Sequence, residues 1–218
     1  MKYIIGNWKA NKKLSDAEAW IKQFLSYDFS KVKHNVQIII CPPYPFIPFL
    51  KEKTVNSPFI KIGSQDVSIY YEGPYTGEVT ARSLTGIVDY AIVGHSERRQ
   101  NFNESDDMLF SKVDHLAMQN IKPIYCIRGK DDAIAPKTNI VAYEPVFAIG
   151  TGQSDTIENI VKVKQSLNLS SQTIFIYGGS VTDDNAALYL RNNDIDGVLP
   201  GSASLDPKRF YGIVSVCA

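Results

Sequence analysis

The 218-residue sequence has few cysteines, no long hydrophobic segment and no excess of either charge. Its cysteines, Cys41, Cys126 and Cys217, are odd in number and far apart, which argues against a disulfide framework and against paired zinc ligands. We therefore expect reduced thiols in a cytoplasmic protein. The segment from Met1 to Lys13 holds only a few apolar residues between lysines, so neither a signal peptide nor a membrane anchor is expected.

The charge balance excludes some classes of partner. Lys plus Arg and Asp plus Glu both number 23, and no basic stripe stands out, so nucleic-acid binding is not expected. Hydrophobic residues make up 44% and charged residues 21%, which is ordinary for a globular protein with a full core. Because α/β barrels run to about 200–250 residues as one unit, we expect residues 1–218 to form one domain.

Strand-like runs recur along the chain, most of them rich in β-branched or aromatic residues, with helix-compatible stretches between several of them. The runs begin near Tyr3, Val36, Ile60, Tyr90, Pro123, Ile140, Ile174 and Gly197. This alternation is typical of a parallel sheet. Seven units have room for a strand and a helix. The fifth, with only Gly129 to Asn139 after its strand, is predicted to have a shortened helix or none.

Three helix starts are predicted from capping residues. Ser15 can cap the first helix while Glu18 reaches back to the cap amide. Ser105 is expected to open a helix that ends near Asn120, and Ser154 a later one.

Eight such units can close into a barrel or form an open, doubly wound sheet. Polar or glycine-rich clusters follow the first, fourth, sixth, seventh and eighth strands. Barrels place active groups at the C-terminal ends of many strands, whereas open sheets concentrate ligands at one switch point. The spread of clusters therefore favours a closed barrel.

The segment from Tyr143 to Gly152 combines a carboxylate with an apolar run and glycines. Glu144 precedes a proline, which restricts it to an extended corner between strand and loop. The run Val146 to Ile149 is apolar for a surface loop, and Gly150 supplies turning freedom. Two interpretations remain open on this segment alone: a proton acceptor beside a flap that closes, or a buried strand with a glycine turn.

Two further clusters carry groups suited to chemistry. Strand alternation directs Asn7 and Lys9 to the same side, where a neutral donor and a cation can face one anion, although a lysine there is more often solvated. In Gly94 to Arg99, His95 is followed by a hydroxyl, a carboxylate and two guanidiniums. A lone histidine is more often structural, but Glu97 in this cluster could hold Lys9 or a neighbouring arginine.

Glycine-rich segments follow the last two strands, at Tyr177 to Ser180 and Gly197 to Ser202. Paired glycines expose backbone N–H groups. In barrels, the loops after strands seven and eight frequently bind phosphate, although either loop alone is a weak signal.

Together these segments resemble the triosephosphate isomerase family, from Tyr3 to the C-terminus. The motifs that carry the resemblance follow predicted strands in the family's order: Asn7-Trp8-Lys9, Gly94 to Arg99, Tyr143 to Gly152, Gly178-Gly179-Ser180-Val181 with Asn185, and Ala203-Ser204-Leu205. The resemblance implies an α/β fold, namely a single (β/α)8 TIM barrel, here with the fifth helix shortened or missing. It also implies interconversion of dihydroxyacetone phosphate and glyceraldehyde 3-phosphate with no cofactor and no metal.

By position in the motifs, the resemblance implies that Glu144 is the base and His95 the electrophile at the carbonyl. Lys9 and Asn7 then stabilise enediolate charge, and Glu97 belongs to the same catalytic group. A glutamate base with a neutral histidine under a water-excluding loop is known of this family. The positions that match its phosphate-binding N–H groups are Gly150, Ser180, Gly201 and Ser202.

The sequence departs from the family pattern at several places. Phe147 stands where the family usually has tryptophan, and phenylalanine keeps an aromatic side chain on the flap. Pro200 and Ser202 replace an aliphatic residue and a glycine, so a left-handed backbone at Ser202 would be strained. Arg128-Gly129 replaces Gly-Glu, and most of the following helical stretch is deleted. We expect this deletion to uncover outer apolar surface of strands four to six, unless a neighbouring helix or another subunit packs there.

The segment from Gly63 to Glu78 resembles the loop by which one family subunit completes the site of its twofold mate. The resemblance implies a homodimer in which Thr76 approaches Asn11 and Lys9 of the partner subunit. A mobile surface loop is the alternative interpretation. Two other functions remain as alternatives: a catalytically silent barrel that binds phosphorylated metabolites or a protein partner, and a different phosphosugar isomerase.

Overall fold

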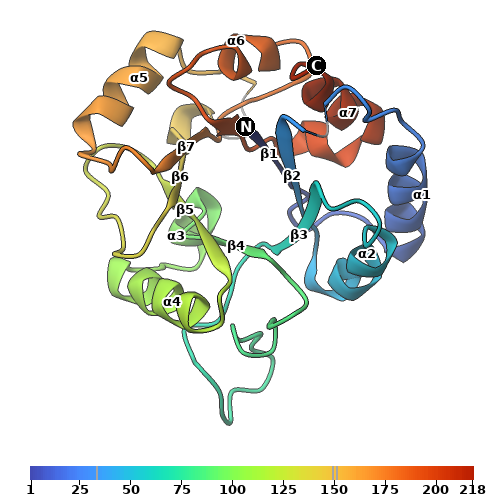
Figure 1. The fold of residues 1–218 in the computed structure, drawn as a ribbon. Coiled ribbons are helices and arrows are strands. Elements are labelled where there is room, and N and C mark those ends of the chain that lie inside the picture. Colours follow the sequence, from blue (N-terminus) through green and yellow to red (C-terminus); the bar gives the residue numbers. More distant parts are fainter. Residues whose placement is uncertain (33, 149, 151) are drawn as a thin grey trace.

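The computed structural model describes residues 1–32, 34–148, 150 and 152–218, and in them eight parallel strands close into a barrel (Figure 1). Each strand pairs with the next along the chain, and β8 pairs with β1. The strands are β1 (Lys2–Asn7), β2 (Val36–Cys41), β3 (Ile60–Ser64), β4 (Tyr90–Val93), β5 (Lys122–Ile127), β6 (Ile140–Tyr143), β7 (Ile174–Tyr177) and β8 (Gly197–Val198). Every predicted strand start lies within one residue of an observed start, and the predicted closed barrel is confirmed.

Helices surround the barrel (Figure 1). They are α1 (Leu14–Leu25), α2 (Ile47–Lys53), α3 (Ser96–Asn101), α4 (Asp106–Met118), α5 (Ile157–Ser166), α6 (Ala186–Leu190) and α7 (Pro207–Ser215), with short 3-10 helices η1 (Tyr44–Phe46), η2 (Val146–Ala148) and η3 (Ser202–Leu205). Within the described residues, none of these helices has the length and apolar character needed to span a membrane.

The first helix starts earlier than predicted, whereas the α4 start is confirmed. α1 begins after Lys13, whose N–H donates to the Asp16 carboxylate at 3.2 Å. Because this carboxylate occupies the cap amide, Ser15 lies inside the first turn and does not cap the helix. α4 begins after Ser105, whose hydroxyl accepts a hydrogen bond from the first turn, as predicted.

α5 begins after Thr156, two residues later than the predicted Ser154. The Thr156 hydroxyl accepts from the Asn159 N–H at 3.3 Å, and its own N–H donates to Asp155 at 2.8 Å. These two bonds satisfy backbone N–H groups at the N-terminus of α5 that have no partner within the helix. The helix then buries Ile160 against the barrel.

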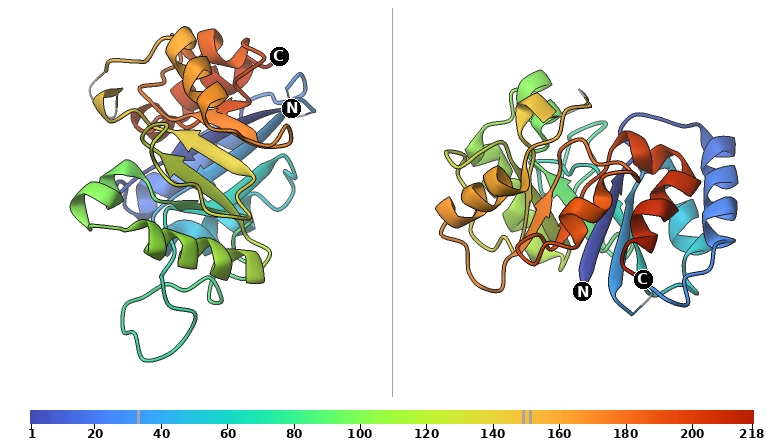
Figure 2. Two further views of the ribbon diagram at one scale, coloured as in Figure 1. Left: turned by 90° about the vertical axis from the view of Figure 1, so that its left-hand side faces the viewer. Right: turned by 90° about the horizontal axis from the view of Figure 1, so that it is seen from above.

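The connection between β3 and β4 has no α-helix, although the sequence predicted one there. Residues 65–80 form an arm that projects from the barrel (Figures 1 and 2), and turns at residues 81–87 precede β4. Gly77 and Gly86 have φ of 94° and 75°, a backbone conformation that interrupts a helix. The arm therefore takes up the chain length that a helix would need.

The connection between β5 and β6, residues 128–139, also has no helix, as predicted. The outward side chains of β4 to β6 are nevertheless buried, namely Ala91, Val93, Tyr125, Ile127, Val141 and Tyr143. Ile134 of the connection packs against the core cluster to which these side chains belong, and the Tyr125 hydroxyl donates to the Ala133 carbonyl at 2.9 Å. The prediction of an uncovered apolar surface on these strands is therefore wrong, because the shortened connection itself folds back over them.

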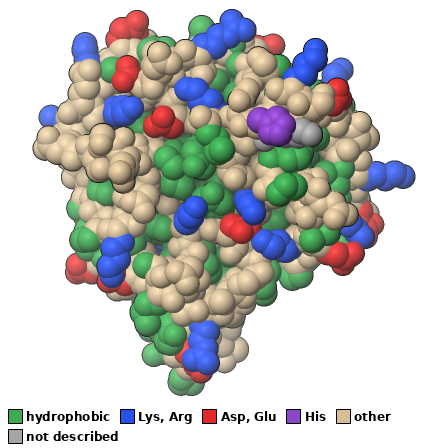
Figure 3. All heavy atoms as spheres, viewed as in Figure 1, with side chains coloured by type: hydrophobic (Ala, Val, Ile, Leu, Met, Phe, Trp, Pro, Cys, Tyr) green, Lys and Arg blue, Asp and Glu red, His purple; other side chains and the backbone are tan. Residues whose placement is uncertain are grey.

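Buried hydrophobic side chains form one cluster inside the barrel and a larger one between strands and helices. The N-terminal ends of the strands face the viewer in Figures 1 and 3, where hydrophobic side chains gather at the centre among charged ones. The C-terminal ends of the strands lie at the opposite end of the barrel (Figure 2). The predicted site residues follow these C-terminal ends.

Candidate active site

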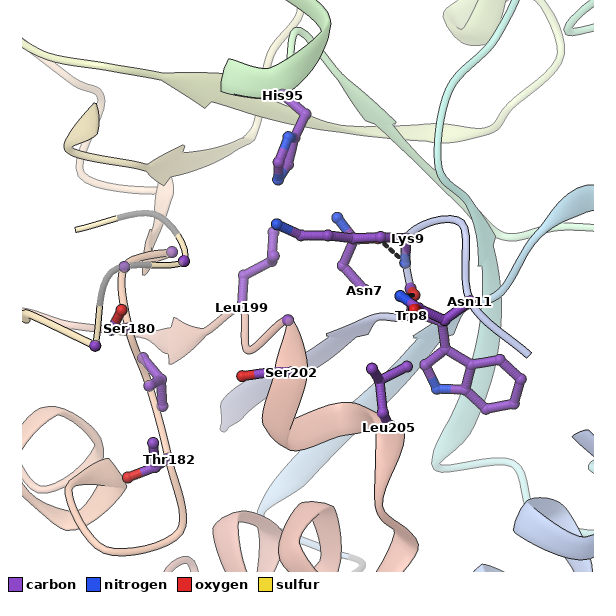
Figure 4. Close-up of a pocket in the computed structure, with 16 residues that line it drawn as sticks. Asn7, Trp8, Lys9, Asn11, His95, Ser180, Thr182, Leu199, Ser202 and Leu205 are labelled. Atoms are coloured by element: carbon purple, nitrogen blue, oxygen red, sulfur yellow. Dashed lines mark hydrogen bonds between the residues drawn. The ribbon is translucent and has the colours of Figure 1, made fainter. Parts of the chain in front are cut away.

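A pocket of about 250 Å³ opens at the C-terminal end of the barrel (Figure 4). Of the residues predicted for catalysis or phosphate binding, it is lined by Asn7, Lys9, His95, Gly150, Ser180, Gly201 and Ser202. Trp8, Asn11, Thr182, Leu199 and Leu205 also contribute to its walls. Among the described residues no group of histidine, cysteine or acidic side chains is arranged to hold a metal ion. The pocket thus collects polar groups from several strand ends, as catalytic barrels do.

Lys9 and Asn7 leave the end of β1 in a fixed conformation. The Lys9 N–H donates to Asn7 Oδ1 at 3.0 Å, and Gln65 Nε2 donates to the Lys9 carbonyl at 2.9 Å. These bonds hold Lys9 at φ 52°, which is uncommon for a residue with a side chain. The Lys9 ammonium pairs with Glu97, as the sequence suggested. Because these side chains are 28% and 43% exposed, the pair orients the cation more than it stabilises the fold.

His95 lies directly before α3, with its side chain turned back onto the helix N-terminus. Its Nδ1 accepts a hydrogen bond from the Glu97 N–H at 3.2 Å. A ring nitrogen that accepts carries no proton, so this bond favours the neutral tautomer with its proton on Nε2. The Lys9 side chain extends across the pocket toward this ring (Figure 4). His95 can therefore donate a proton from Nε2 to an oxygen in the pocket.

Glu144 is fully buried beside His95 and does not line the pocket. Its Oε2 accepts from the Ser96 N–H at 3.0 Å. Its Oε1 lies 3.3 Å from His95 Nε2 but has no hydrogen bond to any described residue. An unpaired buried carboxylate oxygen is costly, so this arrangement favours a side chain that gains a partner by moving.

Of the residues predicted to bind phosphate, Ser180 and Ser202 lie on the side of the pocket away from His95 (Figure 4). The Ser180 hydroxyl donates to the Ala148 carbonyl at 2.6 Å, which joins the loop after β7 to the segment after Glu144. Ser202 is the first residue of η3 and does not have a positive φ. The strain considered for Ser202 from its sequence therefore does not arise.

The predicted flap, residues 146–152, begins with η2. Val146 and Phe147 are 56% and 54% exposed, whereas Ala148 is buried. Gly150 has φ 70°, so it uses the freedom that the sequence predicted for it. Two predicted flap residues lie outside the described part of the chain, Ile149 and Thr151.

The residues predicted to meet a partner subunit are exposed. Thr76 lies on the arm, and Asn11 follows β1, where its Nδ2 donates to the Trp8 carbonyl at 2.6 Å. Within the arm the rings of Tyr70 and Tyr75 stack at 3.5 Å. Part of the arm thus packs on itself, and the subunit contact stays a prediction.

Sequence reasoning missed two groups near Glu144. Cys126 lies on β5, and burial raises the pKa of its thiol well above the usual range, with a further contribution from the Glu144 carboxylate. Asp155 follows the flap, is only 6% exposed and accepts from the Tyr143 hydroxyl at 3.1 Å. Neither position carried a local signal, because both depend on neighbours that meet only when the barrel closes.

Sequence comparisons agree with this arrangement. A profile of the family described as "Triosephosphate isomerase" matches residues 2–137 and 130–217, two segments that meet at the shortened β5–β6 connection. Triosephosphate isomerase from Dictyoglomus thermophilum is 33% identical over 247 residues, covering 98% of each chain. The Aquifex aeolicus protein is 34% identical over 245 residues and 97% of each chain. The Dehalococcoides mccartyi protein is 36% identical over 98% of this chain and 95% of its own. Since these matches run through all the strands of the closed barrel, the chain belongs to the triosephosphate isomerase family.

Proposed function

We propose that this chain interconverts dihydroxyacetone phosphate and D-glyceraldehyde 3-phosphate, a step of glycolysis and gluconeogenesis, by proton transfer through an enediolate. Family membership supports this function. The observation that carries it is one pocket in which Asn7, Lys9 and His95 face the loops after β7 and β8, with Glu144 Oε1 3.3 Å from His95 Nε2. The proposal invokes no cofactor, because side chains can supply both proton transfer and charge stabilisation.

In the proposed mechanism Glu144 is the base. A proton on a carbon beside a carbonyl is a weak acid in water, so its removal needs a fixed base and donors where negative oxygen develops. Glu144 leaves the Ser96 N–H, takes the proton from one carbon and returns it to the next. His95 Nε2–H polarises the carbonyl, and Lys9 with Asn7 stabilises the enediolate oxygens. Glu97 holds the Lys9 ammonium in place.

The phosphate is proposed to bind the backbone N–H groups of Gly150, Ser180, Gly201 and Ser202, all of which line the pocket. Backbone N–H groups cannot lose their protons and are suited to a dianion. An enediolate open to solvent would eliminate its phosphate, so a flap that closes over it and excludes water suppresses this side reaction. Val146 and Phe147, exposed in this structure, are the apolar side chains available to cover the substrate.

We further propose a homodimer in which Thr76 of the arm approaches Asn11 and Lys9 of the partner subunit. The projecting arm and its exposed threonine support this proposal. Light scattering coupled to size exclusion tests it, since a monomer at micromolar concentration would contradict it. We also propose that residues 1–218 form one domain and that the protein lies in the cytoplasm. The free thiols support the cytoplasmic location.

A coupled assay with glyceraldehyde 3-phosphate tests the proposed function. The expected result is turnover by the wild-type chain that is lost in Glu144→Gln, which has nearly the same shape but no base. Turnover no faster than the free-solution reaction would refute the enzyme and leave the catalytically silent barrel. No observation on the described residues favours that alternative.

A further inference from the structure

A buried aspartate, Asp155, lies three residues after the last residue of the flap, Gly152. Asp155 is 6% exposed, whereas its neighbours Ser154 and Thr156 are exposed. Within residues 1–32, 34–148, 150 and 152–218, no lysine, arginine or histidine nitrogen forms a salt bridge with its carboxylate. A buried carboxylate without a cation is costly unless hydrogen bonds satisfy it.

Hydrogen bonds from two directions satisfy this carboxylate. On one side, Oδ1 accepts from the Thr156 N–H at 2.8 Å and from Asn159 Nδ2 at 3.1 Å, at the positive N-terminus of α5. On the other side, Oδ2 accepts from the Tyr143 hydroxyl at 3.1 Å. Burial raises the pKa of Tyr143, and Asp155 raises it further, so this hydroxyl keeps its proton and stays a donor.

The backbone of Asp155 is held by a second tyrosine. The Asp155 N–H donates to the Tyr177 hydroxyl at 2.7 Å. Tyr143 and Tyr177 are paired neighbours at the ends of β6 and β7. One leads directly into Glu144 and the other into the glycine-rich loop that begins at Gly178. Asp155 thus connects the end of the flap to the strand that carries the base and to the strand that precedes the phosphate loop.

We propose that the Asp155 carboxylate is a positioning residue, which holds the C-terminal end of the flap on Tyr143 and keeps the closed flap in register with Glu144. This inference rests on the proposed isomerase function. Asp155 touches no substrate and acts through the geometry of the flap. Its loss should therefore loosen the seal over the enediolate and not remove the chemistry.

The test compares Asp155→Ala, Asp155→Asn and Thr156→Ala for kcat, KM and the fraction of intermediate that eliminates phosphate. Asp155→Ala removes hydrogen bonds to a charged group, so we expect the eliminated fraction to rise about tenfold and kcat to fall. Asp155→Asn should restore most of the wild-type partition, because its carbonyl can accept from Thr156 while its amide donates to the Tyr143 oxygen. A purely structural role would not move this partition.

Thr156→Ala is the matched control, because it removes the cap of the same helix but no contact to Tyr143. It should lower the melting temperature by about 2–4 °C and leave the partition unchanged. Tyr143→Phe should raise elimination as Asp155→Ala does, and the double variant should be no worse than Asp155→Ala alone.

Three results would overturn the proposal: an unchanged partition in Asp155→Ala, an equal rise in Thr156→Ala, or no recovery in Asp155→Asn. In each of these cases the isomerase function would stand. A wild-type chain without turnover would instead overturn the function and this inference together.

Discussion

Replacing Glu144 with aspartate probes the base by position and not by charge. The carboxylate is retained but withdrawn by about 1 Å, and misplacement of that size costs on the order of 10²-fold in rate. The backbone cannot follow to compensate. The Glu144 N–H donates to the Ile127 carbonyl at 2.7 Å, and a methyl group at Gly178 would lie only 2.8 Å from Glu144 Cγ. We therefore expect the full loss, about 2.7 kcal/mol in the activation barrier.

The measurement is kcat for glyceraldehyde 3-phosphate in the coupled assay, with KM determined in parallel. KM should change little, because the phosphate contacts are untouched. Glu158→Asp, on the exposed face of α5, is the matched control and should keep wild-type kcat. Full kcat in Glu144→Asp would mean that Glu144 is not the base.

Further predictions concern the flap, the cation and the fifth connection. Deleting Phe147 to Thr151 should increase phosphate loss from the intermediate, measured as the elimination product; unchanged partitioning would contradict a water-excluding flap. Lys9→Met should lower kcat/KM by on the order of 10²-fold or more, and near-normal values would show that this cation does not stabilise the enediolate. Tyr125→Phe removes the hydrogen bond to Ala133 and should lower the melting temperature by about 2–4 °C by calorimetry. No change there would mean that the shortened connection is not held as described.

The strands were predictable because each is a short run of β-branched or aromatic residues between turns, and β-branched side chains pack well on a sheet. The starts of the helices were less predictable. Ser15 and Ser154 had suitable side chains, but α1 begins earlier, with the Asp16 carboxylate on the Lys13 N–H, and α5 begins later, with Thr156 as its cap. Local sequence does not settle which of several nearby residues caps a helix, since serine, threonine and aspartate are all good cap formers.

The site likewise has residues that could be predicted from the sequence and residues that could not. Asn7, Lys9 and His95 were recognisable because each lies at or just after the end of a strand, and barrel closure brings strand ends together. The role of Asp155 could not be recognised from the sequence, because its partner Tyr143 is twelve positions away and contacts it only across the base of the flap. The cover over β5 was missed for a related reason. A short connection without a helix gives no periodic signal that Ile134 will turn inward.

A crystal structure with a phosphate-bearing analogue of the enediolate tests the central claim most directly. The account predicts the phosphate on the N–H groups of Ser180, Gly201 and Ser202, and the Glu144 carboxylate turned from Ser96 to the ligand carbons. A ligand bound elsewhere, or Glu144 still hydrogen-bonded to Ser96 with the pocket filled, would contradict it.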